Sequence, residues 1–309
     1  YFMEVTTNPP CNTALLDPYT PSSENPWTSQ KIKHLYRRLA FGVNLDGIDA
    51  TLALSPAAVV DSIVNAAVDL DPTPAPLWGY YGISDFSDFD SENPENVSQW
   101  YIQTANDTIS EGLRAKLTMF WMNHFVTELE GYGSYAPYMF QYYNLMQTHA
   151  LGNFKEFVRE VGINSAMLIY LNGFENTSNN PNENYARELF ELFTLGENNN
   201  YTQQDILQAA RALTGYNHWD EPGAEIYFDQ STWDANPKTV FGSEEFYTYD
   251  ELIDTLFDLR ETEIAQFICA KLYQYFVSQQ YDALTQQDII NPLAQTLIDA
   301  NFEMAPMLT

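Results

Sequence analysis

Hydrophobic residues recur at helical spacing along most of the chain. The pattern begins after residue 27, where Ile32, Leu35 and Leu39 repeat every three or four positions before Gly42. A Ser-Pro pair then predicts a second helix that runs to residue 68. Further helices are predicted at 97–128, 135–150, 153–161, 165–171, 182–195 and 202–214, and again from residue 249. The sequence therefore predicts a mainly α, multi-helix domain with orthogonal or bundle-like packing.

Three segments interrupt the helical pattern. Repeated prolines at 1–27 predict an extended N-terminal arm, and the mixture of Pro, Asp, Ser and aromatic residues at 71–96 predicts a long surface loop. Two short apolar runs, 226–228 and 239–241, predict one short β-hairpin near 225–242. We therefore divide the chain into an arm, 1–27, and a single helical domain, 28–309.

The two ends and the hydropathy of the chain bear on its location. The sequence begins at Tyr1 without a basic and apolar leader, so a signal peptide would be already removed or lie outside the sequence. No apolar run approaches the roughly 20 residues that cross a bilayer, so no transmembrane segment is predicted. The last residues follow directly on an amphipathic helix, and we expect the domain to continue beyond residue 309.

The charge of the chain is strongly acidic. It has 42 Asp and Glu against 13 Lys and Arg, a formal net charge of -29. Nucleic acid and anionic lipid surfaces are poor partners for such a chain, because both are bound chiefly by Lys and Arg. Asp88, Asp90 and Glu92 alternate as in a calcium loop, but they lack the central Gly and closing Glu of an EF-hand, which favours a solvated acidic loop.

Positive charge gathers on the first predicted helix. Lys31, Lys33, Arg37 and Arg38 lie within eight positions around His34. One interpretation is a basic face that pairs with the acidic bulk of the domain. The other keeps Arg38 as a candidate binding residue.

Two histidines fall on apolar stripes. His124 continues a stripe formed by Leu113, Leu117 and Trp121, and His149 ends another with Tyr142, so both should point inward. Inward histidines on neighbouring helices could meet and bind a metal. Alternatively, each is a core residue that bonds to a backbone carbonyl.

The segment 182–196 carries the strongest local pattern. Asn182 is a plausible N-cap, Gly196 a stop, and Tyr185, Leu189, Leu192 and Phe193 form the expected buried stripe.

Two carboxylates lie at the margin of that stripe. Glu188 and Glu191 could ligate a divalent metal if His124 and His149 completed the shell, or act as an acid and a base. The four residues are the candidate catalytic and metal-binding set. The alternative is an ion-pair network in which the two carboxylates neutralise Arg187, Arg211 or Arg38.

The fourth histidine follows the helix predicted at 202–214. His218 lies in a loop after Gly215, where binding groups are common, but it could also stack on Trp219 at the surface. It joins Arg38, Arg187 and Arg211 as a candidate binding residue. The sequence contains no nucleophile elbow, phosphate-binding glycine loop, HExxH or CxxC motif.

Several of these segments share their order and spacing with a known family. They resemble the bacterial family catalogued as domain of unknown function 1800, from about residue 30 to the end, and are most similar to its members from marine Bacteroidetes. The segments that carry the resemblance are 34–42, 120–125, 149–154, 167–171, 182–196, 211–215 and 271–277.

The resemblance implies an exported, mainly helical protein, with no activity that could be transferred. It also implies a longer C-terminal part, and a frequent genomic neighbour that encodes an exported protein related to sulfatases and phosphatases. Met122 stands where many members have a second His, and Tyr216 where many have Trp. The first difference weakens a metal site built on a His-x-His pair.

Two functions remain open. The favoured hypothesis is an exported cell-surface or extracellular assembly or scaffold protein, whose partner is the sulfatase- or phosphatase-related exported protein. The other is an extracytoplasmic hydrolase or oxidoreductase, with or without a divalent metal, that has a His, Glu and Arg site between helices. Whether Cys11 and Cys269 pair is also open.

Overall fold

The described part of the chain is mainly helical, as predicted. The computed structural model describes residue 16 and residues 18–308, so most of the arm predicted at 1–27 lies outside the described residues. The first helices are α1 (Ser29–Leu39), α2 (Leu45–Leu52), α3 (Pro56–Val68), α4 (Phe89–Ser110), α5 (Leu113–His124), α6 (Ala136–Thr148), α7 (Phe154–Ile163) and α8 (Ser165–Tyr170). The later helices are α9 (Asn184–Glu188), α10 (Gln203–Ala212), α11 (Tyr249–Leu259), α12 (Glu261–Phe276), α13 (Ala283–Thr285) and α14 (Asn291–Asp299).

Shorter elements complete the fold. Single turns of 3₁₀ helix are η1 (Ile83–Asp85), η2 (Leu129–Tyr132), η3 (Gly173–Glu175) and η6 (Ala305–Leu308). Two segments are π-helical, η4 (Leu189–Thr194) and η5 (Gln286–Ile290). The strands are β1 (Tyr216–Asn217), β2 (Tyr227–Phe228), β3 (Lys238–Val240) and β4 (Ser243–Glu245).

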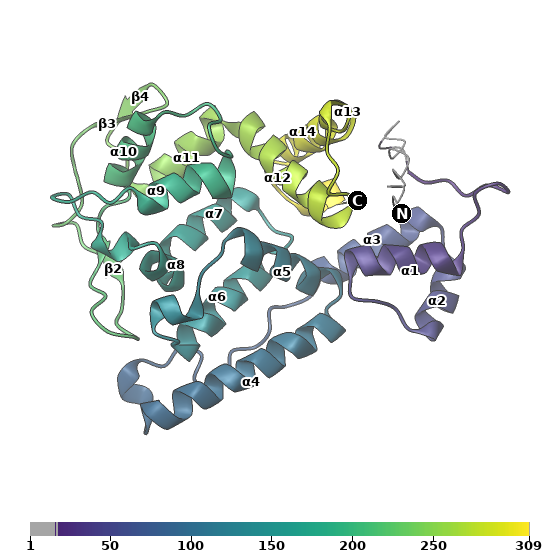
Figure 1. Cartoon of the computed structure of the whole chain (residues 1–309), viewed down its shortest axis with the longest axis horizontal. Helices are drawn as coiled ribbons and strands as arrows, with labels where there is room; N and C mark the ends of the chain where they lie inside the picture. The colour runs from purple at the N-terminus through teal and green to yellow at the C-terminus, as the bar shows by residue number, and fades with distance from the viewer. Residues whose placement is uncertain (1–15, 17, 309) are drawn as a thin grey trace, which may run out of the picture.

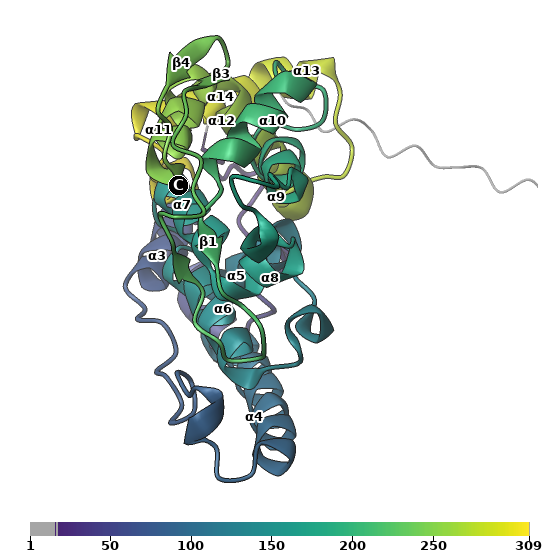
Figure 2. The same ribbon diagram turned by 90° about the vertical axis from the view of Figure 1, so that its left-hand side faces the viewer.

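The helices are grouped by position in space. Helices α1, α2 and α3 lie together at one end of the molecule, and the strands lie at the opposite end (Figure 1). Between them are α5, α6 and α7, with α12 and α14 packed together above (Figure 1). Figure 2 shows α4 extending along the edge away from α11 and α12.

Short polar side chains define where several helices begin. The side chains of Thr28, Asn44 and Ser55 accept hydrogen bonds from backbone N–H groups in the first turns of α1, α2 and α3. Pro56 follows Ser55 at the first helical position, so the predicted start of α3 is confirmed. The same kind of cap begins later helices at Asn153, Asn164, Thr202 and Thr248.

The prediction for residues 71–128 was wrong at two points. The expected loop ends early, because α4 begins at Phe89, where the carboxylates of Asp90 and Glu92 favour a helix N-terminus. The single helix predicted at 97–128 is divided by Gly112, whose φ of 57° an α-helix cannot include. Asp88, Asp90 and Glu92 thus belong to the start of α4, where the Glu92 carboxylate accepts a hydrogen bond from the backbone N–H of Asp88.

Both predicted strands are present, and each pairs with a neighbour of its own. Strand β3 forms a short antiparallel hairpin with β4, and β2 pairs with β1, which directly follows α10. The predicted region 225–242 therefore contains one strand from each of two separate two-stranded sheets. The β1–β2 sheet places residues 227–228 beside the segment that contains His218.

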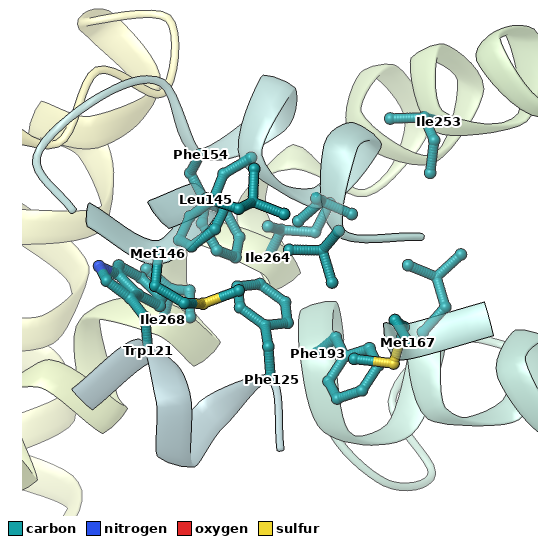
Figure 3. Close-up of a cluster of buried hydrophobic side chains, with 14 of the residues drawn as sticks. Trp121, Phe125, Leu145, Met146, Phe154, Met167, Phe193, Ile253, Ile264 and Ile268 are labelled. Carbon is teal, nitrogen blue, oxygen red and sulfur yellow. The ribbon is translucent and has the colours of Figure 1, made fainter. Parts of the chain in front are cut away.

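Aromatic side chains fill the core around α5. Trp121 stacks on Phe125 and Phe154 and meets Phe157 edge-on, and its indole N–H donates to the Ala150 carbonyl over 3.0 Å. Figure 3 shows this cluster with side chains that come from α6, α8, α11 and α12. Rings of this size bury large apolar areas and fix their neighbours by shape. The helix α5 is therefore the centre of the main core.

No helix among the described residues has both the length and the hydrophobicity that crossing a membrane requires.

Close packing around Gly162 gives a test of the core. A Cβ at this position would lie 2.2 Å from the hydroxyl oxygens of Tyr185 and Tyr249. The Tyr249 hydroxyl donates to the carbonyls of Val158 and Arg159, so moving it breaks buried hydrogen bonds. We expect Gly162→Ala to lower the free energy of unfolding by about 2 kcal/mol, although alanine favours helix. Urea unfolding measures the change.

Gly82→Ala is the matched control. A Cβ at Gly82 would have its nearest neighbour, a carboxylate oxygen of Asp85, at an ordinary 3.7 Å. We expect this variant to unfold within about 0.5 kcal/mol of the parent. Equal stability of the two variants would contradict the packing that the structure shows around Gly162.

Candidate functional site

The residues marked by sequence lie in separate parts of the fold. His124 is at the end of α5 and His149 follows α6, while Glu188 and Glu191 flank the start of η4. The remaining candidates are Arg38 on α1, Arg187 on α9, Arg211 on α10 and His218 after β1. Their individual contacts show what each one does.

The π-helical segment η4 shapes the surroundings of His124. Its wider turns change which side chains face inward: Phe190 and Phe193 are buried, whereas Leu192 is 40% exposed. The prediction that Leu192 belongs to the buried stripe was wrong, because that stripe assumed regular α-helical spacing. Near the end of η4, His124 Nε2 lies 3.0 Å from the Phe193 carbonyl, and Lys271 Nζ lies 3.5 Å from the Leu192 carbonyl.

His124 is a neutral core residue. Its ring stacks on Phe120 and packs against Phe125, Phe193 and Phe267. Because a carbonyl can only accept, Nε2 must carry the proton and donate it to Phe193, which leaves Nδ1 buried without a hydrogen-bond partner. Burial, and then the nearby charge of Lys271, lower the pKa of His124 to about 3 against the weaker effect of that hydrogen bond.

His149 is directed inward, as predicted, but its ring contacts α7 and not His124. Its ring stacks on Phe157 with the centroids 5.1 Å apart, and Nε2 lies 3.0 Å from a carboxylate oxygen of Glu160. Both contacts are with α7. His149 therefore helps to fix α7 against the end of α6.

The carboxylates around η4 differ in their surroundings. Arg187 forms ion pairs of 3.1 Å with both Glu183 and Glu191, and also donates to Gln203 at the start of α10. The carboxylate of Glu188, in contrast, has no hydrogen bond or ion pair with any described residue. Burial, and then the charge of Glu191, raise the pKa of Glu188. The predicted ion-pair network thus exists for Glu191, and Glu188 stands outside it.

Arg211 belongs to a second ionic cluster. Its Nε donates to an Asp234 oxygen over 2.7 Å, and the buried Lys238 ammonium donates to the Asp234 and Asn236 carbonyls. Burial opposes ionisation of Asp234, but hydrogen bonds from Arg211 and Asn236 outweigh it and lower its pKa to about 2. The cluster ties α10 to the chain between the two small sheets.

His218 lies on the surface of the β1–β2 sheet. Its Nε2 is 2.9 Å from an Asp229 oxygen, and its ring stacks on Tyr227 with the centroids 4.4 Å apart. The Ser231 hydroxyl and backbone N–H donate to the other Asp229 oxygen. Hydrogen bonds from Ser231, and then from His218, lower the pKa of Asp229. His218 stacks on Tyr227 and not on Trp219, which was one of the two alternatives that the sequence left open.

The predicted metal ligands do not form a cluster. Within residues 18–308 and residue 16, no three His, Cys, Asp or Glu side chains are arranged so that they could hold a metal ion. His124 and His149 contact different elements, and Glu191 is paired with Arg187. Cys269 is a buried thiol 3.3 Å from the Met307 sulfur, and its pairing with Cys11 lies outside the described residues.

One buried polar network was not predicted. Arg114 on α5 is 3% exposed, pairs with Glu111 and donates to the carbonyls of Leu70 and Asp71. Its neighbour Asp107 is also 3% exposed. The hydroxyls of Thr73 and Tyr143 donate to Asp107, and the Gln147 amide bridges Thr73 and Glu111. In the sequence, Asp107, Glu111 and Arg114 are four and three residues apart, and this spacing could have indicated the network. The network joins α4, α5, α6 and the long loop.

Comparison with known proteins identifies a family. The family model described as "Protein of unknown function (DUF1800)" matches residues 34–309. No curated protein and no solved structure matches the chain significantly.

The neutral state of His124 predicts a pH dependence of stability. Its pKa is about 3 in the fold and near 6.5 when unfolded, so the unfolded state gains a proton as the pH falls below 6.5. Stability is therefore complete above pH 6.5 and is lost towards pH 3. Between pH 7.5 and pH 5, we expect this residue alone to cost about 2 kcal/mol of unfolding free energy.

His124→Gln separates this effect from the titration of the many carboxylates. A glutamine amide can donate to the Phe193 carbonyl but gains no proton in this range. Urea unfolding at both pH values should show the smaller loss in the variant. Parallel profiles for the two proteins would mean that His124 is not held neutral.

The buried network makes a separate prediction for Arg114. Arg114→Met leaves the Glu111 carboxylate, whose side chain is 8% exposed, without its counter-charge. We expect a loss of about 3–5 kcal/mol of unfolding free energy at neutral pH. Adding Glu111→Gln should restore part of it. If the double variant is no more stable than Arg114→Met, charge burial is not the cause of the loss.

Proposed function

The chain belongs to the family described as protein of unknown function DUF1800, and from this we propose that it is an exported assembly or scaffold protein of the cell surface or extracellular space. Its partner in this proposal is another exported protein, related to sulfatases and phosphatases. The proposed source is a bacterium of the marine Bacteroidetes type. The net charge of -29 supports a role in a hydrated, salty environment, where an acidic surface maintains solubility.

One observation carries the proposal: most of the polar residues singled out from sequence bond to other parts of the fold. His124 bonds to the η4 backbone, Glu191 to Arg187, and Arg211 to Asp234. A donor or acceptor that serves the fold is released to a substrate only when that bond breaks, which removes its contribution to stability. This pattern favours residues that hold a framework in shape.

Cross-linking in intact cells of the source bacterium tests the proposal. A tagged full-length protein should be accessible to an impermeant amine-reactive cross-linker, and one exported protein should be enriched with it over an unrelated exported bait. Mass spectrometry identifies the product. A tagged protein that stays in the cytoplasm, or one that is cross-linked to no exported protein, would contradict the proposal.

A second candidate is the extracytoplasmic hydrolase or oxidoreductase, with or without a metal. Glu188 favours it, because this partly buried carboxylate has a raised pKa and no bond to a described residue, and it adjoins a π-helical segment. Such segments often occur at functional sites. Glu188 would then transfer a proton as an acid, with Glu191 as the neighbouring base.

Substitution of Glu188 distinguishes the two candidates. Because the fold raises the pKa of this carboxyl, its ionised form is disfavoured in the native state, and stability falls as the pH rises through that pKa. For a scaffold, Glu188→Gln should therefore melt at an equal or higher temperature at pH 7. Elemental analysis of the parent and the variant after dialysis against a weak chelator should show the same metal content. Stoichiometric zinc, iron or manganese that disappears in Glu188→Gln would favour the enzyme.

A further inference from the structure

Positive charges are divided unevenly between the fold and α1. Every Lys and Arg outside α1 contacts a carboxylate, a carbonyl oxygen or an aromatic ring of the described chain. On α1, Lys31 bonds to Tyr19 and Asn25. Lys33, Arg37 and Arg38 are exposed, and their side chains have no hydrogen bond, ion pair or ring contact with any described residue. For these three side chains, the described residues do not supply the pairing with the acidic bulk of the domain that one interpretation of the sequence expected.

These exposed cations lie on one side of α1. Lys33 and Arg37 are four positions apart, as are His34 and Arg38, so the four exposed side chains form two adjacent rows on the helix surface. The opposite side is anchored by Ile32, which is fully buried. The buried side of α1 is therefore packed against the domain, and its positively charged side faces solvent.

A groove of mixed polar and apolar lining begins where α1 ends. It has a volume of about 480 Å³, and its lining includes the apolar Phe41, Val43 and Ile109 and the polar Asn44 and Thr108. Ile109 is 85% exposed and Phe41 44%. The Lys116 ammonium lies 4.8 Å from the centre of the Phe41 ring, which adds a cation at the edge of the groove. Figure 1 shows the end of α4 beside the group formed by α1, α2 and α3.

We propose that α1 and this groove form the docking surface for an acidic segment of a partner protein. A large apolar side chain of that segment occupies the groove, and its carboxylates bind Lys33, Arg37 and Arg38. This inference deepens the proposed scaffold function and rests on it. It names the chemistry of the partner and the surface that receives it.

Charge and shape together select this partner. Arginine binds carboxylates through two parallel hydrogen bonds, and interfaces commonly combine an apolar centre with a charged rim. The remaining surface of a chain with a net charge of -29 repels an acidic segment and so directs it to α1. A nucleic acid extends far beyond three cations, and its other phosphates would meet the acidic surface.

Fluorescence anisotropy with model peptides tests the surface. The probes are fluorescein-labelled peptides of repeated Glu-Glu-Leu, Glu-Glu-Ser and Lys-Lys-Leu units, added to the whole protein at low and at physiological ionic strength. The variant replaces Lys33, Arg37 and Arg38 with Ala. The control variant removes the same charge elsewhere by replacing Lys155, Arg159 and Arg260 with Ala. Circular dichroism verifies that both are folded.

The expected result is binding of the Glu-Glu-Leu peptide that weakens with salt and falls at least about tenfold in the α1 variant. The control variant should retain the affinity of the parent, and the Glu-Glu-Ser peptide should bind at least about tenfold more weakly. Equal losses in both variants, no binding by the parent, or preference for Lys-Lys-Leu would each overturn the inference.

Sedimentation of the parent at low salt tests whether a second copy of the chain occupies this surface instead. A dimer that disappears in the α1 variant would overturn the inference, because the surface would then serve self-association. If the peptide binds as expected but cross-linking in cells finds no exported partner, the docking surface stands and the scaffold function fails.

Discussion

The fold depends on how α5 satisfies polar groups inside an aromatic core. Trp121 and His124 lie one turn apart on its inward side, and each directs a nitrogen to a backbone carbonyl, of Ala150 and of Phe193 respectively. Both carbonyls belong to irregular backbone, one after α6 and the other in the π-helical η4. An unpaired carbonyl in a dry core costs about 1–3 kcal/mol, so the two bonds determine where these segments can lie. The rings around them then fix the positions of α7 and α12 by shape.

This arrangement explains why a histidine lies where a leucine would fill space as well. Leucine cannot donate, so the Phe193 carbonyl would lose its side-chain partner and the wider turn of η4 its support. A charged imidazole would serve no better, because ionisation inside the aromatic core is strongly unfavourable. The residue must donate a hydrogen bond, be flat enough to stack on Phe120, and stay neutral. These requirements are structural, and they account for His124 without a substrate.

Sequence patterns predicted what depends on local spacing. The inward positions of His124 and His149, and the capped start of α3 at Ser55, follow from side-chain periodicity and capping and are confirmed. The errors occur where distant parts of the chain decide. The π turn that exposes Leu192 requires partners from α5 and α12, and the burial of Arg114 requires carbonyls some forty residues earlier. A single sequence contains these residues but not their proximity, so it could list candidate site residues without showing which of them meet.

The contacts that the fold gives to each charged side chain also indicate where a binding surface can lie. In an acidic chain, a cation acquires an internal partner wherever the fold brings a carboxylate or carbonyl near it, as Arg187 and Arg211 illustrate. A cation in such a pair must give up its internal partner before it can bind another protein, so it is less suited to recognition than a cation that has none. Exposed cations without a partner keep their hydration and lose little when they bind another protein, while long-range attraction concentrates acidic segments near them. With respect to the described residues, Arg37 and Arg38 meet this condition, and the groove that contains Phe41 and Ile109 begins nearby. The end of α1 is therefore better suited to recognition than His124 and His149.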